Sequence, residues 1–99
     1  MKQMLLMLNH PLTETQHTDA RANWDVTGFV AMPEDEARLW GQVPPEIGSI
    51  KTYAQPIVQW IRENSQAGDL ALIQGEFGLV FATVTACLEM GLHPVYATT

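Results

Sequence analysis

The chain has 99 residues, which suits a single domain with its own hydrophobic core. Eleven acidic residues against five lysines and arginines give a formal net charge of −6 at pH 7. This charge argues against binding to long DNA or RNA, which needs many cationic phosphate contacts, but allows a small anion held by backbone amides. Cys87 is the only cysteine, which excludes an internal disulfide and a cysteine-based metal site.

The first half of the chain predicts two strands and two helices in alternation. The apolar run over residues 3–8 is typical of a buried strand, and Pro11 stops any helix directly after it. This run is too short for a signal-peptide core or a membrane span, so we expect a cytoplasmic protein with no membrane partner. A Thr-x-x-Gln capping box then predicts a helix over residues 13–24. A second strand over residues 25–32 and a short helix over residues 33–40 follow.

The second half continues the alternation. Helical spacing of apolar residues predicts a longer helix over residues 46–66, which Pro56 should kink or divide. The continuous apolar run over residues 70–73 is typical of a strand covered on both faces. An almost uncharged helix over residues 79–88 and a last strand over residues 93–99 complete the pattern.

This alternation predicts a single Rossmann-like α/β domain over residues 1–99, with a mainly parallel four-stranded sheet flanked by helices. We expect the first and third strands to be neighbours, with the second outside the first and the fourth outside the third. The chain then reverses direction between the two central strands, and ligands of open α/β sheets bind at such a switch point. The turns at residues 9–10 and 74–78, together with Thr98 and Thr99, would share this edge.

The turn QGEFG at residues 74–78 is the first candidate for a ligand cradle. Its glycines allow backbone N–H groups to approach an anion at the start of the next helix, where the helix dipole favours negative charge. Gln74 offers a side-chain amide, and Phe77 either stacks on a base or closes the core. The turn lacks the lysine of a P-loop and the three-glycine dinucleotide fingerprint, and a plain tight turn explains the glycines equally well. Glu76 suits either a general base or a favourable charge at a helix start.

His10 is the candidate acid or base, because histidine exchanges protons near neutral pH and this one directly follows a predicted buried strand. The alternative is an exposed loop histidine or a helix cap. The three histidines are scattered, and neither HExxH nor a carboxylate triplet occurs, so we expect no metal and no cofactor. Trp24, Trp40 and Trp60 fit a core or a homodimer interface better than a ligand platform.

Four ordered motifs resemble the small CRISPR-associated Csx-twenty family over essentially the whole chain. They are NHPLT at residues 9–13, LW with PPE at residues 39–46, IQGEFG at residues 73–78 and YATT at residues 96–99. This family accompanies type III CRISPR systems. The resemblance implies a homodimeric ring nuclease that ends antiviral signalling by opening cyclic oligoadenylate, with cyclic tetra-adenylate as the expected ligand. It also implies metal-independent attack of a ribose 2′-OH on the adjacent phosphate.

With this reading, His10 and Gln74 are the catalytic residues, His10 as acid, base or phosphate donor and Gln74 as part of the phosphate cradle. The expected ligand contacts are Asn9, Gly75, Glu76, Phe77, Gly78, Thr98 and Thr99. The sequence departs from common phosphate-transfer sites because no lysine or arginine lies in or beside the two turns. Arg21, Arg38 or Lys51, or a partner chain, would have to supply the positive charge. Two alternatives stay open: a protein that sequesters the ring without cutting it, and a small α/β interaction subunit.

Overall fold

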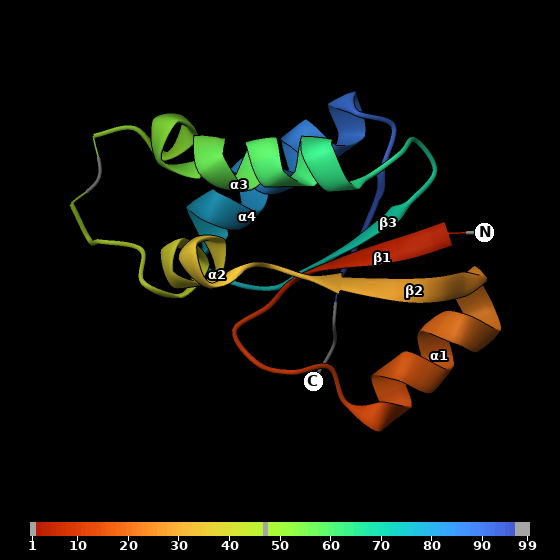
Figure 1. Ribbon diagram of the computed structural model, residues 1–99. Helices are drawn as coiled ribbons and strands as arrows, with labels where there is room; N and C mark the ends of the chain where they lie inside the picture. The colour runs from red at the N-terminus through yellow and green to blue at the C-terminus, as the bar shows by residue number, and fades with distance from the viewer. Residues whose placement is uncertain (1, 47, 97–99) are drawn as a thin grey trace.

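The computed structural model describes residues 2–46 and 48–96, in which strands and helices alternate (Figure 1). In chain order the elements are β1 (Lys2–Met7), α1 (Glu14–Trp24), β2 (Val26–Ala31), α2 (Glu34–Gly41), α3 (Ile50–Asn64), β3 (Leu70–Ile73), α4 (Phe77–Glu89) and β4 (His93–Val95). The four strands form one sheet in the order β2-β1-β3-β4, and every pairing is parallel. The predicted α/β class and the predicted strand order are both confirmed.

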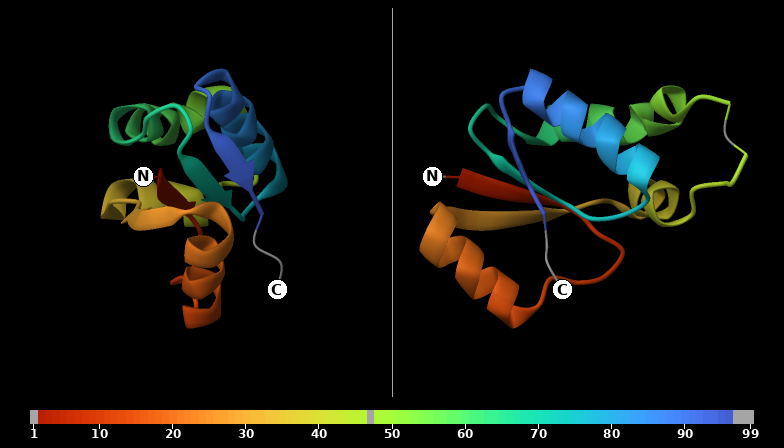
Figure 2. Two further views of the ribbon diagram at one scale, coloured as in Figure 1. Left: turned by 90° about the vertical axis from the view of Figure 1, so that its right-hand side faces the viewer. Right: turned by 180° about the vertical axis from the view of Figure 1, so that it is seen from behind.

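The sheet lies between two layers of helices. Helix α1 covers one face, and α3 and α4 lie side by side on the other (Figures 1 and 2). Strand β3 shows why its four residues are all apolar: Ala71 and Ile73 join the core beneath α3 and α4, whereas Leu70 and Leu72 join the core beneath α1. All four are buried, because alternate side chains of a central strand point to opposite faces and both faces are covered.

The capping box predicted for α1 is present. The hydroxyl of Thr13 accepts a hydrogen bond from the Gln16 backbone N–H at 3.1 Å, and the Gln16 side chain accepts one from the Thr13 N–H at 2.9 Å. These two bonds satisfy backbone donors that have no partner within the helix. They fix the point at which the loop after β1 becomes helix.

The helix predicted over residues 46–66 is shorter at both ends, because α3 begins at Ile50 and ends at Asn64. Its start is set by Ser49, whose hydroxyl accepts a hydrogen bond from the Thr52 N–H at 3.3 Å. Pro56 does not divide the helix. Pro56 is exposed, and it lacks the N–H that other residues of the helix interior donate to the backbone.

The last strand is also shorter than predicted. It ends at Val95 rather than continuing over residues 93–99, and Thr98 and Thr99 lie outside the described residues. Strand β4 pairs with β3 through Leu72 and Val95, which places Tyr96 just beyond the carboxyl edge of the sheet. Of the expected C-terminal site residues, neither threonine can therefore be located relative to the turns.

Asp69 joins the amino-terminal ends of the two central strands. It is buried, with one carboxylate oxygen accepting from the Gln3 N–H at 3.1 Å and the other from the Gln66 N–H at 3.0 Å. We expect Asp69→Ala to lower the free energy of unfolding by about 2 kcal/mol, because two backbone donors lose a charged acceptor. Urea denaturation measures this loss. Asp35→Ala is the matched control, since Asp35 is exposed and should change stability by less than about 0.5 kcal/mol; an equally small effect at Asp69 would contradict the role assigned to it.

Candidate functional site at the switch point

Two turns meet beyond the carboxyl ends of the central strands β1 and β3. The Gln74 N–H donates to the carbonyl of Met7 at 3.0 Å and so holds the second turn against the end of β1. His10, in the first turn, brings its ring Nε2 to 3.3 Å from the side-chain Oε1 of Gln74. The two residues assigned as catalytic from the sequence, 64 positions apart in the chain, are therefore in contact.

The contacts of His10 determine which of its ring nitrogens carries a hydrogen and which one faces Gln74. Its Nδ1 lies 2.9 Å from the carbonyl oxygen of Pro11, which can only accept, so Nδ1 carries a hydrogen. In the neutral ring, Nε2 has no hydrogen and accepts a hydrogen bond. The side-chain NH₂ group of Gln74 donates this bond when the amide is turned so that its O and N atoms exchange positions. In the charged ring Nε2 donates to Oε1 instead. Gln74 thus serves both protonation states, and Nε2 is the nitrogen available for proton transfer.

Trp40 forms the back wall of the second turn. This residue is almost completely buried, and its indole N–H donates to the carbonyl of Gln74 at 3.0 Å. A Cβ on Gly75 would lie 2.8 Å from Trp40 Nε1, closer than real Cβ atoms approach other atoms, and 3.0 Å from Cε2, which is also unusually tight. The Trp40 indole therefore requires glycine at position 75, whether or not a ligand binds on the open side of the turn. Trp40, expected only in the core or an interface, is part of the architecture of the site.

Glu76 caps α4 with its own carboxylate. Its two oxygens accept from the Gly78 N–H at 2.8 Å and the Leu79 N–H at 3.0 Å. The Gly78 amide, expected to be part of the phosphate cradle, is therefore already hydrogen-bonded to a local carboxylate. The N–H groups of Gly75, Glu76 and Phe77 donate no hydrogen bond within residues 2–46 and 48–96, and these three remain as donors for an anion.

The other expected contacts differ in placement. Phe77 is 85% exposed, so it does not close the core. Asn9 is exposed and lies beside the end of α2, where its Oδ1 would be 3.2 Å from a Cβ at Gly41. The remaining histidines lie away from the turns: the His17 ring packs edge-on against Phe29, and His93 lies at the amino end of β4.

Among the described residues, the arginines considered as phosphate partners are engaged or directed elsewhere. The guanidinium of Arg38 pairs with two acids of its own helix, at 3.3 and 3.6 Å. Arg21 lies over the ring of Phe29, on the face of the sheet covered by α1. Lys51 lines a groove between α3 and α4. Phe77 and Gly78 of the second turn line the same groove, so Lys51 is the basic side chain of the described residues that lies on the α3 side of this turn.

A hollow of about 640 Å³ adjoins the second turn. Gln74 and Gly75 line one end, and its walls are mainly apolar side chains of α4 together with Tyr96. Phe77 and Tyr96 are both largely exposed there, 85% and 69% respectively. Exposed aromatic rings beside a polar turn are suited to stacking on a nucleobase. Tyr96 was not assigned to the site from the sequence, although it falls in the terminal YATT motif.

Metal binding and nucleophilic attack by a cysteine are two other kinds of chemistry that the residues of a site can support. Within residues 2–46 and 48–96, no group of three or more His, Cys, Asp and Glu side chains is arranged to hold a metal ion. Cys87 is buried in the core, and this burial raises the pKa of its thiol to about 11. At neutral pH Cys87 is therefore a protonated core residue rather than a nucleophile.

The fold and site define a doubly wound α/β protein with a histidine–amide pair at its switch point. Its sequence matches the model of the family described as "Uncharacterized protein MJ1673 family" over residues 2–99, and the chain belongs to this family. A relative from Methanocaldococcus jannaschii, "Uncharacterized protein MJ1673", is 35% identical over 99 residues, covering 100% of this chain and 77% of the relative. No solved structure matches the chain. Among the described residues, no helix has the length and apolar character needed to cross a membrane.

Proposed function

We propose that this protein binds cyclic oligoadenylate, with cyclic tetra-adenylate as the ligand to test first, and opens the ring without a metal ion. The observation that carries this proposal is the contact between His10 and Gln74 at the switch point. It joins an acid–base group to a polar turn with open amides, next to exposed aromatic rings. The resemblance of the ordered motifs to the Csx-twenty family supports the choice of ligand. With this function, the protein acts in the cytoplasm as an accessory of type III CRISPR defence, which is part of the same proposal.

The proposed chemistry is a transesterification within one nucleotide linkage. The ribose 2′-oxygen forms a bond to the adjacent phosphorus, the bond from phosphorus to the 5′-oxygen breaks, and the products are a 2′,3′-cyclic phosphate and a 5′-hydroxyl. One proton leaves the 2′-OH and one is added to the departing 5′-oxygen; His10 Nε2 carries out one of these two transfers and water carries out the other. Gln74 orients the ring, and the amides at residues 75–77 stabilise the phosphate charge. Tyr96 stacks on an adenine.

Sequestration without cleavage is the second candidate, and the position of Glu76 favours it. Its carboxylate adds negative charge at the start of α4, and no lysine or arginine of the described residues forms a hydrogen bond or ion pair with either turn. A site with a single acid–base group can bind a phosphate. It is less able to stabilise the additional negative charge that develops in the transition state of cleavage. The same turns would then bind the intact ring.

The deciding experiment incubates the full chain with radiolabelled cyclic tetra-adenylate in EDTA and analyses the products on denaturing and native gels in parallel. Linear products ending in 2′,3′-cyclic phosphate support metal-independent cleavage. An intact but shifted ring supports sequestration and removes the catalytic role of His10. If the ring is neither cut nor shifted, the proposal fails and the reading as an interaction subunit takes its place.

Glu76→Ser tests whether the start of α4 is the phosphate cradle. Serine also caps helices, so stability should change little, while one negative charge leaves the site. We expect the affinity for cyclic tetra-adenylate to rise about tenfold, because the carboxylate that repels the phosphate is gone while the dipole of α4 remains. Filter binding at fixed ionic strength measures this change. Glu63→Ser, an exposed position on α3, controls for net charge; equal affinities for both variants would exclude the cradle.

A further inference from the structure

The outer face of α4 is an apolar stripe with no partner within the described residues. Phe77, Phe81 and Leu88 are 85%, 59% and 61% exposed, and Val84 lies between them. From Phe77 to Leu88 the helix carries no charged residue at all. Helices that are apolar all round are normally buried, and α3 and the sheet cover only one side of this one. The stripe is therefore an interaction surface.

The spacing of the stripe is symmetric. Phe77, Phe81, Val84 and Leu88 are separated by four, three and four positions. The spacing is therefore the same when it is counted from either end of the helix. An antiparallel copy of α4 would place Phe77 against Leu88 of the second copy, and Phe81 against its Val84. Residues at this spacing share one helix face, and an isologous two-fold interface requires such a self-complementary patch.

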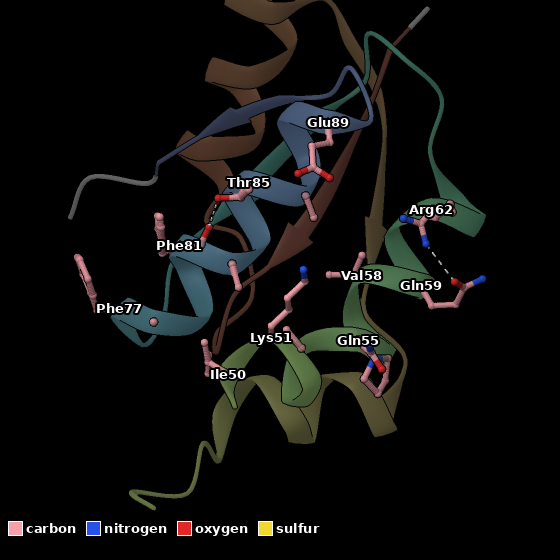
Figure 3. A pocket seen from close by; sticks show the side chains of 15 residues that line it. Ile50, Lys51, Gln55, Val58, Gln59, Arg62, Phe77, Phe81, Thr85 and Glu89 are labelled. Carbon is pink, nitrogen blue, oxygen red and sulfur yellow. Dashed lines mark hydrogen bonds between the residues drawn. The ribbon is translucent and has the colours of Figure 1, made fainter. Parts of the chain in front are cut away.

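The charges beside the stripe have the same symmetry. Figure 3 shows Lys51 reaching between α3 and α4 near the start of α4, with Glu89 at the far end of the same groove. Arg62, also at the far end, donates to the side chain of Gln59 at 3.2 Å. An antiparallel second copy brings its Glu89 to Lys51, and the two-fold axis repeats this pairing at the other end. In a chain with net charge −6, an uncharged stripe flanked by complementary ends allows two copies to associate without direct repulsion.

The exposed area of the stripe suits a weak dimer. With about 200 Å² for a fully exposed aromatic side chain, the exposed fractions of Phe77 and Phe81 correspond to about 290 Å² per copy. Two copies then bury about 580 Å² through these rings alone, and Val84, Leu88 and the flanking charged side chains add to it, so the interface lies at the small end of specific contacts.

We propose that the protein forms a two-fold homodimer in which α4 packs antiparallel on α4 of a second copy, centred between Phe81 and Val84. This inference does not rest on the proposed ligand. It gives the homodimer expected from the sequence a defined interface. The tryptophans suggested for that role are not part of it, because Trp40 and Trp60 are buried in the core and Trp24 lies at the end of α1.

Sedimentation equilibrium of the full chain tests the proposal at about 100 µM, above the micromolar dissociation constants that interfaces of this size reach. The wild type should be a dimer. Phe81→Glu should weaken the dimer at least about 30-fold, the effect of losing a central anchor. Ala22→Glu, at an exposed position of α1, adds the same charge and should leave the dimer intact. A monomeric wild type, or a Phe81→Glu variant as dimeric as Ala22→Glu, would overturn the proposal.

A charge exchange tests the antiparallel arrangement without altering the apolar stripe. Lys51→Glu and Glu89→Lys should each weaken the dimer about tenfold, since each places like charges opposite one another at both ends of the interface. The double variant restores opposite charges and should recover most of the affinity. A double variant no tighter than either single variant would show that the two ends do not meet. Both positions are exposed, so folding is expected to be unaffected.

Discussion

Gly75→Ala is expected to lower the free energy of unfolding by about 3 kcal/mol, a large cost for the addition of one methyl group. The new Cβ would lie 2.8 Å from the indole nitrogen of Trp40, which is 1% exposed and enclosed by core side chains. Relief of this clash requires the indole to move and to lose its hydrogen bond to the carbonyl of Gln74. Backbone strain is not the cause, because the described glycines with positive φ are Gly68 and Gly91. Urea denaturation followed by circular dichroism measures the loss.

Two further variants isolate this contact. Gly48→Ala is the matched control, because a Cβ at Gly48 meets no atom within 4 Å and should change stability by less than about 0.5 kcal/mol. Trp40→Phe removes the atoms that clash, so Gly75→Ala should cost less than about 1 kcal/mol in that background. If Gly75→Ala is equally costly with phenylalanine at position 40, the indole is not what requires the glycine.

His10→Ala is expected to reduce the single-turnover rate of ring opening by a factor of about 10² to 10⁴, the usual contribution of a positioned acid or base. Binding of the ring should weaken by no more than about tenfold, because only one hydrogen-bonding group is lost. The two quantities are separated by measuring cleavage with saturating protein and affinity by filter binding. A loss of binding with no change in rate would make His10 a ligand contact rather than a catalyst.

Two variants control for this result. His93→Ala removes a histidine from the opposite edge of the sheet, where its ring lies 5.2 Å from that of Trp24, and should leave the cleavage rate unchanged. Gln74→Ala leaves Nε2 of His10 without its partner and should produce an intermediate loss, since the ring is then less well oriented. If His93→Ala slows the reaction as much as His10→Ala, the histidine at the switch point has no special role.

The fold could be predicted because local signals agreed with one another. The four apolar residues at 70–73 and the capping box at Thr13 each indicate one element, and the alternation of elements leaves a parallel sheet as the simple arrangement. The strand order was inferred as an arrangement in which the chain reverses direction between the first and third strands, and the structure has this order. The start of α3 was wrong by four residues, because the Ser49 cap competes with an apolar pattern that extends further back. Such boundaries depend on a single side-chain hydrogen bond.

The candidate site was predictable only in part. The meeting of His10 and Gln74 follows from strand order, since both turns leave the carboxyl ends of neighbouring strands. The position of Trp40 beneath Gly75 does not follow from strand order. It results from the packing of α2 against the turn, which leaves no local pattern in the sequence. The capping role of Glu76 was not predictable, because glutamate is not among the preferred N-cap residues and the sequence indicated only a favourable charge at a helix start.

The hydrogen bond from the Trp40 indole to the Gln74 carbonyl makes the second turn as rigid as the core behind it. A loop held only by surface contacts opens locally, whereas this one opens only when a buried indole is displaced. The Trp40 indole hydrogen should therefore exchange with solvent deuterium nearly as slowly as the amides of β3. A ligand that binds to the front of the turn meets a surface already in its final shape, and little of its binding energy is lost in ordering that surface.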